Sequence, residues 1–99
     1  MSYVLTEANG TITVTPTALA GLVMQAAETV PGATVRRGRR RLDVDLAAGR
    51  ARVRLELAVR YGESLPDVAH AVQERVADAL ATMCRLEVDG VDVSVEEVE

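Results

Sequence analysis

The chain has 99 residues, a formal net charge of −4 and hydrophobic side chains at 48% of its positions. This length fits one domain with a modest core. No apolar run is long enough to span a membrane. The acidic net charge argues against general affinity for nucleic acid. A single cysteine, Cys84, excludes an internal disulfide, and because the N-terminus lacks a signal-peptide pattern we expect a cytoplasmic protein.

The first third of the chain predicts a short strand followed by a helix. Residues 1–10 are expected to form a flexible lead-in that holds at most a short extended piece at Tyr3–Leu5 and ends at an Asn-Gly turn. The β-branched run 11–14 is typical of a strand, after which Thr15 can cap a helix and Pro16 fits its first turn. We therefore expect a helix from Pro16 to about Thr29, ended by the Pro-Gly pair that follows it.

The middle of the chain predicts an antiparallel hairpin. Apolar and charged residues alternate over 42–46 and again over 52–59, and Ala48–Gly49 marks the reversal between them. One register satisfies both faces of this hairpin, because it places apolar residues opposite apolar ones and acids opposite arginines. The predicted pairs are Val44 with Val53, Leu42 with Leu55, Leu46 with Ala51, Asp45 with Arg52, Asp43 with Arg54, and Arg41 with Glu56.

The last third predicts a capped helix and a final strand. Ser64 is the candidate N-cap, Pro66 fits the first turn, and an apolar stripe then recurs at helical spacing as far as Met83. From about Leu86 the apolar residues change phase once, which predicts a bulge or kink at Gly90 that keeps the valines on one face.

These elements predict an α+β fold in the order β-α-β-β-β-α-β. We expect a two-layer sandwich in which both helices cover one face of a mainly antiparallel sheet and leave the other face in water. A short strand at 33–36 supplies the remaining strand, the single domain spans 11–95, and residues 96–99 form an acidic tail.

One stretch gives the chain a family resemblance. Tyr61-Gly62 at a strand end is followed by Pro66-Asp67-Val68-Ala69 and then by Val72-Gln73-Glu74 with Val76. Together with Ile12-Thr13-Val14-Thr15-Pro16 near the start and Val91-Asp92-Val93 near the end, this resembles the alkaline shock protein 23 family. Two positions depart from the family pattern. Cys84-Arg85 stands where the family usually has small residues at the end of the helix, often Thr-Gly, and Asp92 stands where it often has Asn.

The resemblance implies a non-enzymatic protein linked to cell-envelope stress, with no catalytic residue, cofactor or metal to carry over. It also implies protein partners, since some members are held at the inner face of the membrane by a small anchor protein and form assemblies. The expected function is therefore that of a binding or scaffold protein acting through protein–protein contacts, including self-association.

Residues 36–41, with the sequence RRGRRR, are the candidate docking site. Five arginines around one glycine are typical of an exposed loop, which is often only solvated. As a site, Arg36, Arg37, Arg39 and Arg40 would take an acidic protein segment, anionic lipid head groups or RNA phosphates. The alternative function is thus a small RNA-binding domain, although no aromatic residue lies beside the arginines to stack on bases.

Other reactive side chains do not form a constellation. His70 is expected on the solvent side of its helix, too far from Cys84 to act as its base. Ser64 is explained as a cap. We therefore predict no catalytic residue and no metal site.

Overall fold

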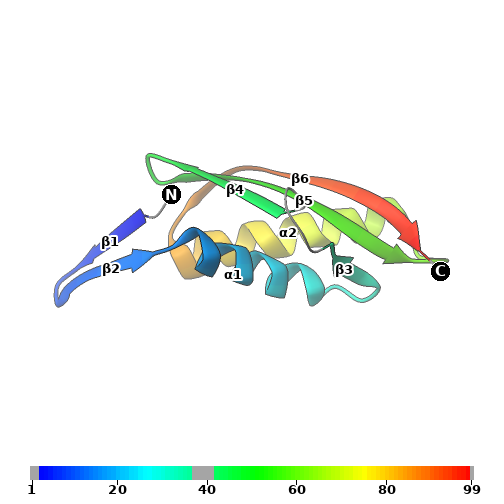
Figure 1. Ribbon diagram of the computed structural model, residues 1–99, viewed down its shortest axis with the longest axis horizontal. Helices are drawn as coiled ribbons and strands as arrows, with labels where there is room; N and C mark the ends of the chain where they lie inside the picture. Colours follow the sequence, from blue (N-terminus) through cyan, green and yellow to red (C-terminus); the bar gives the residue numbers. More distant parts are fainter. Residues whose placement is uncertain (1–2, 37–41, 99) are drawn as a thin grey trace.

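The centre of the fold is β5 (Arg50–Arg60), the strand that pairs on both of its edges. The computed structural model describes residues 3–36 and 42–98, and it shows two helices on one side of a four-stranded sheet (Figure 1). The predicted two-layer α+β sandwich is confirmed. The other elements are β1 (Tyr3–Glu7), β2 (Gly10–Val14), α1 (Pro16–Glu28), β3 (Ala33–Val35), β4 (Leu42–Ala47), α2 (Leu65–Cys84) and β6 (Glu87–Val98).

The two edges of β5 are occupied differently. On one edge, β4 pairs antiparallel with the first half of β5 and β3 pairs antiparallel with its end. On the other edge, β6 runs parallel to β5 along its whole length. The parallel pairing was not anticipated; it follows from α2, a 20-residue crossover helix that returns the chain to the same end of the sheet.

The predicted β4–β5 register is confirmed. Val44 lies opposite Val53, Asp43 opposite Arg54 and Asp45 opposite Arg52. The two-residue reversal is Ala48–Gly49, with φ of 53° and 76°, as a twist-matched hairpin turn requires. The predicted partner of Glu56, Arg41, lies outside the described residues.

The predicted irregularity in the last strand is also present. Ala51 pairs with Val88 and Arg52 with Gly90, so Asp89 is an extra residue and β6 is bulged there. The bulge resets the phase, and the apolar residues on both sides of it pack against the core, namely Leu86, Val88, Val91, Val93 and Val95.

The core between the layers consists of aliphatic side chains. In β5, Val53, Leu55, Leu57 and Val59 are fully buried, and α2 faces them with Val68, Val72, Val76, Leu80 and Cys84. α1 contributes Leu19, Val23 and Ala27. Among the described residues, no polar or charged side chain is buried.

The two helix caps differ. At α1, the Thr15 hydroxyl accepts a hydrogen bond from the Ala18 amide at 3.2 Å, as predicted. Ser64 occupies the N-cap position of α2, but its side chain makes no capping hydrogen bond, so the predicted hydroxyl contact is wrong. Because Pro66 has no N–H and Asp67 lies in the first turn, this helix start depends less on a hydroxyl cap.

Both ends of the chain hold more strand than expected. The lead-in predicted over 1–10 contains β1, which pairs antiparallel with β2 from Tyr3 opposite Val14 to Glu7 opposite Gly10. At the other end, β6 continues to Val98 into the expected acidic tail, since β5 is long enough to pair with it. Neither extension changes the two-layer core.

The buried stripe of α2 gives a direct test of the core. Leu80 is fully buried, and Leu80→Ala should lower the free energy of unfolding by about 2–5 kcal/mol, because the removed methyl groups leave a cavity between the layers. The measurement is urea denaturation followed by circular dichroism. Met83→Ala, one turn away at 67% exposure, is the control and should change stability by less than about 0.5 kcal/mol. Equal losses would contradict the placement of α2.

Candidate interaction surface

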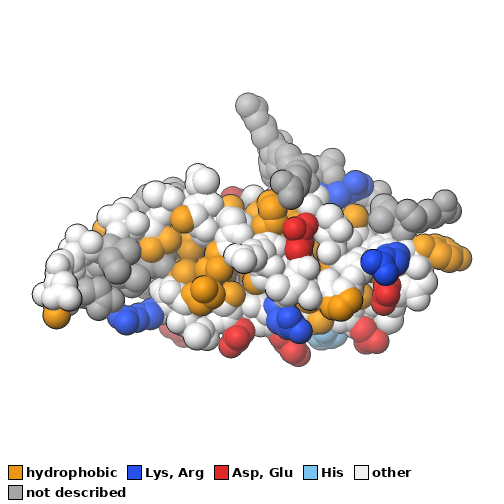
Figure 2. Space-filling model, turned by 90° about the horizontal axis from the view of Figure 1, so that it is seen from below, with side chains coloured by type: hydrophobic (Ala, Val, Ile, Leu, Met, Phe, Trp, Pro, Cys, Tyr) orange, Lys and Arg blue, Asp and Glu red, His pale blue; other side chains and the backbone are white. Residues whose placement is uncertain are grey.

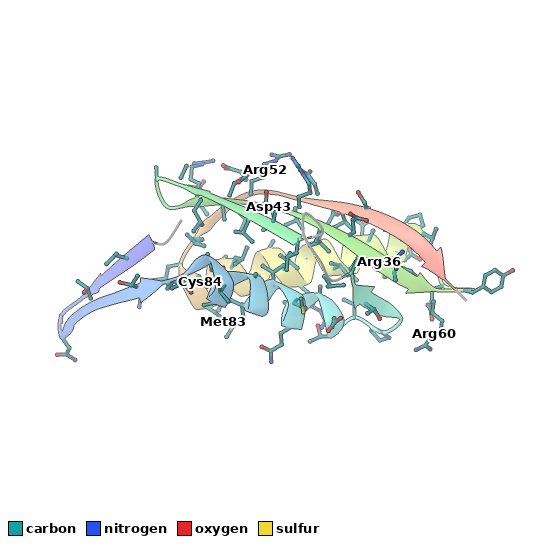
Figure 3. The ribbon with its side chains drawn as sticks, viewed as in Figure 1. Arg36, Asp43, Arg52, Arg60, Met83 and Cys84 are labelled. Atoms are coloured by element: carbon teal, nitrogen blue, oxygen red, sulfur yellow. The ribbon has the colours of Figure 1, made fainter. Side chains whose placement is uncertain are left out.

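The predicted arginine-rich site begins where β3 ends. The Arg36 amide donates to the Glu56 carbonyl of β5 at 2.9 Å, and the Arg36 side chain is half-buried beside the sheet (Figure 3). Arg37, Arg39 and Arg40 lie outside the described residues. The structure therefore fixes one end of the candidate segment to the sheet edge, and the docking role of its arginines stays a prediction.

The face of the sheet away from the helices is charged. Side chains of β4, β5 and β6 that alternate with the core residues point outward there, with Arg52 and Asp43 on the side opposite α1 and α2 (Figure 3). We call this surface the outer sheet face. Over β4, the first half of β5 and the adjoining part of β6, its exposed charged residues are Asp43, Asp45, Arg50, Arg52, Arg54, Glu87, Asp89 and Asp92.

The ion pairs of the outer sheet face join β5 to β6. Arg50 contacts Asp89 and also Glu87, with 3.1 Å between Nη1 and Oε2. Arg52 holds Asp92 through two of its nitrogens, with Nη2 3.1 Å from Oδ2 and Nε 3.2 Å from the same oxygen. The sequence placed Asp45 opposite Arg52 correctly, but the carboxylate that Arg52 binds belongs to the parallel neighbour strand.

Gly90 makes room for the Arg52 contact. A Cβ added at Gly90 would lie 3.1 Å from Nη1 of Arg52, which is closer than ordinary van der Waals contact. The bulge restores the apolar phase of β6, and the missing side chain of Gly90 leaves space for the guanidinium that binds Asp92.

The charge balance of the outer sheet face is acidic. Among the residues named above, three arginines are outnumbered by five carboxylates, and Arg50 and Arg52 form ion pairs with these carboxylates. Exposed pairs of this kind add little stability each. The face can nevertheless present ordered charges of both signs to a protein partner, and it offers little to the phosphates of RNA.

The other predicted residues are not brought together. His70 is exposed on α2, as expected, whereas Cys84 is buried in the core near the other end of that helix. Within residues 3–36 and 42–98 there is no group of three or more His, Cys, Asp or Glu that could hold a metal ion. In the same part of the chain, no helix is long and apolar enough to cross a membrane.

Sequence reasoning missed the exposed apolar side chains. Val4 is 56% exposed, Tyr61 68% and Met83 67%. Figure 2 shows apolar side chains gathered on the helix side of the molecule, nearer the end that carries β1 and β2. For Val4 the signal was the extended pattern of residues 3–5. Met83 was placed in the apolar stripe of α2 by its spacing, and the structure corrects this, because its side chain is exposed.

The fold and this surface define a small two-layer α+β domain with an open, charged sheet face. The particular family follows from a family-model match over residues 35–99, which is most of the chain. The chain belongs to the alkaline shock protein 23 family, whose function is described as cell envelope-related. No curated protein matches the chain.

Solved structures with this fold include C-terminal domains of MamM. A variant in its cadmium form is 25% identical, with a TM-score of 0.59, and the match covers 84% of this chain and 96% of that one. A copper form is 24% identical, with 84% and 98% covered, and a nickel form is 23% identical, with 84% and 99% covered, both at a TM-score of 0.59. These similarities support the two-layer architecture.

The Arg50–Asp89 pair generates a pH prediction. The hydrogen bond from Arg50 lowers the pKa of Asp89 below its ordinary value of 3.8. The pair therefore favours the folded state above that value, and its contribution is lost as the pH falls through the lowered pKa. In NMR titrations, Arg50→Gln should return the Asp89 pKa toward 3.8, and Arg54→Gln should leave it unchanged. An unchanged Asp89 pKa in Arg50→Gln would show that the pair does not persist in solution.

Proposed function

We propose that this protein is a non-enzymatic binding protein of the envelope stress response, acting through protein–protein contacts near the cytoplasmic face of the membrane. The observation that carries the proposal is the family membership, with its cell envelope-related function. The open outer sheet face supports it, because it presents ordered charges of both signs to a partner.

The proposed location is peripheral. Attachment would come through a partner, such as the small membrane-anchor protein that the family resemblance implies. The partner's binding segment would be acidic, since the strongest local concentration of positive charge in the sequence is residues 36–41.

Arg36, Arg37, Arg39 and Arg40 are proposed to dock that segment. The hydrogen bond between the Arg36 amide and β5 ties the start of the run to a rigid strand, and Leu42 resumes the sheet at β4 on the same edge. Guanidinium groups bind carboxylates in a bidentate geometry, which favours Arg over Lys for such a contact.

RNA binding is the weaker alternative. The outer sheet face has an excess of carboxylates. Arg50 and Arg52 on this face already form ion pairs with carboxylates of the same chain. A filter-binding assay with a steep salt dependence would favour RNA; flat, weak retention would favour the protein partner.

Cell fractionation tests the proposal. The wild-type protein should be recovered with the envelope fraction, and Arg37→Glu with Arg39→Glu should move most of it to the soluble fraction, because charge reversal repels an acidic partner. Arg60→Glu with Arg75→Glu makes the same change in net charge elsewhere and should leave the distribution unchanged. Soluble wild-type protein would contradict envelope attachment, and equal behaviour of the two double variants would exclude the arginine segment as the docking site.

A further inference from the structure

The β1–β2 hairpin forms a sheet of its own. It is joined to the main domain through Thr15, and it projects beyond α1 at one end of the molecule (Figure 1). Within the described part of the chain, β1 and β2 make most of their contacts with each other. A two-stranded hairpin is marginally stable in water by itself. Val14 at the end of β2 packs against the main core, whereas β1 has no second partner strand among the described residues.

The hairpin is nearly uncharged and rich in strand-forming residues. Glu7 is the one charged residue from Tyr3 to Val14. The register places Tyr3 opposite Val14 and Leu5 opposite Ile12, and the Val4 side chain is 56% exposed. A surface of this composition favours contact with another strand.

The open edges of the main sheet are protected, and those of the hairpin are not. β3 has three residues, β4 carries Asp43 and Asp45, and β6 is bulged and carries acids along its length. The Gln73 side chain also donates to the Val91 carbonyl of β6 at 3.0 Å. Short strands, charges and bulges are the devices by which proteins prevent edge-to-edge pairing. β1 has none of these except Glu7 at its end.

The backbone of β1 is arranged to accept a strand. Glu7 and Gly10 flank a two-residue loop, and in such a hairpin alternate residues turn their N–H and C=O groups away from the partner strand. Val4 and Thr6 hold the outward positions on β1. The outer edge of β2 is less open, because α1 begins two residues after Val14.

We propose that β1 is a pairing edge for a second copy of this chain. The two β1 strands would run antiparallel across a two-fold axis, so that two hairpins form one four-stranded sheet. Such a contact is self-complementary and closed, because the same edge serves both copies. The low charge of the hairpin permits this contact in a chain whose net charge of −4 otherwise opposes self-association.

Sedimentation of purified protein tests the proposal, independently of envelope attachment. The wild type should show a reversible monomer–dimer equilibrium. Val4→Asp should weaken the dimer by at least about tenfold, because the two new carboxylates would lie near each other across the axis. Thr13→Asp is the matched control: Thr13 is the cross-strand partner of Val4 and is also exposed, but it lies on β2, so its charges would be separated by both β1 strands. Its dimer constant should stay within about threefold of wild type.

Each alternative outcome overturns the proposal. A wild-type protein that remains monomeric at every concentration excludes the pairing, and equal weakening by the two variants excludes β1 as the edge. Melting curves of both variants check that the main domain folds. Dimerisation that disappears between about 50 mM and about 500 mM salt would assign self-association to charged surfaces instead of to this hairpin.

Discussion

The burial of β5 on one face is the constraint on which the rest of the structure depends. Its inward side chains, Val53, Leu55, Leu57 and Val59, are fully buried, and both of its edges are paired. A shift of one residue would place arginines in the aliphatic core. The strand therefore fixes the register of β4 and β6, and the helices can cover only its apolar side.

Because β5 is buried on one face only, the opposite face of the sheet is accessible to other molecules. The buried face is occupied by aliphatic packing, and the exposed face by ion pairs that join β5 to β6. A chain built in this way presents strands, charges and edges to other molecules. The family's cell envelope-related function and this architecture are both compatible with the proposed role in protein–protein contacts.

Much of the fold was predictable because two patterns agreed. In β4 and β5 the apolar residues and the charges each selected the same register, and the phase change before Val91 indicated the bulge. The parallel direction of β6 was not predictable from its own residues, since it depends on where α2 returns the chain. The Arg52–Asp92 pair was missed for the same reason.

The interaction surface was less predictable than the core. Arg36 was identified from the local concentration of arginines. Its half-buried position depends on the hydrogen bond between its amide and β5, which the composition of residues 36–41 does not predict. The strand at 11–14 and the turn before it were predicted, but the pairing of β1 with β2 was missed, because residues 1–10 were assigned to a lead-in.

Residue-resolved amide hydrogen exchange under increasing denaturant tests the central claim most directly. If β5 organises the fold, its amides from Val53 to Val59 should exchange only through global unfolding, more slowly than those of every other strand. Exchange from β5 as fast as from β4 or from the hairpin would contradict the account.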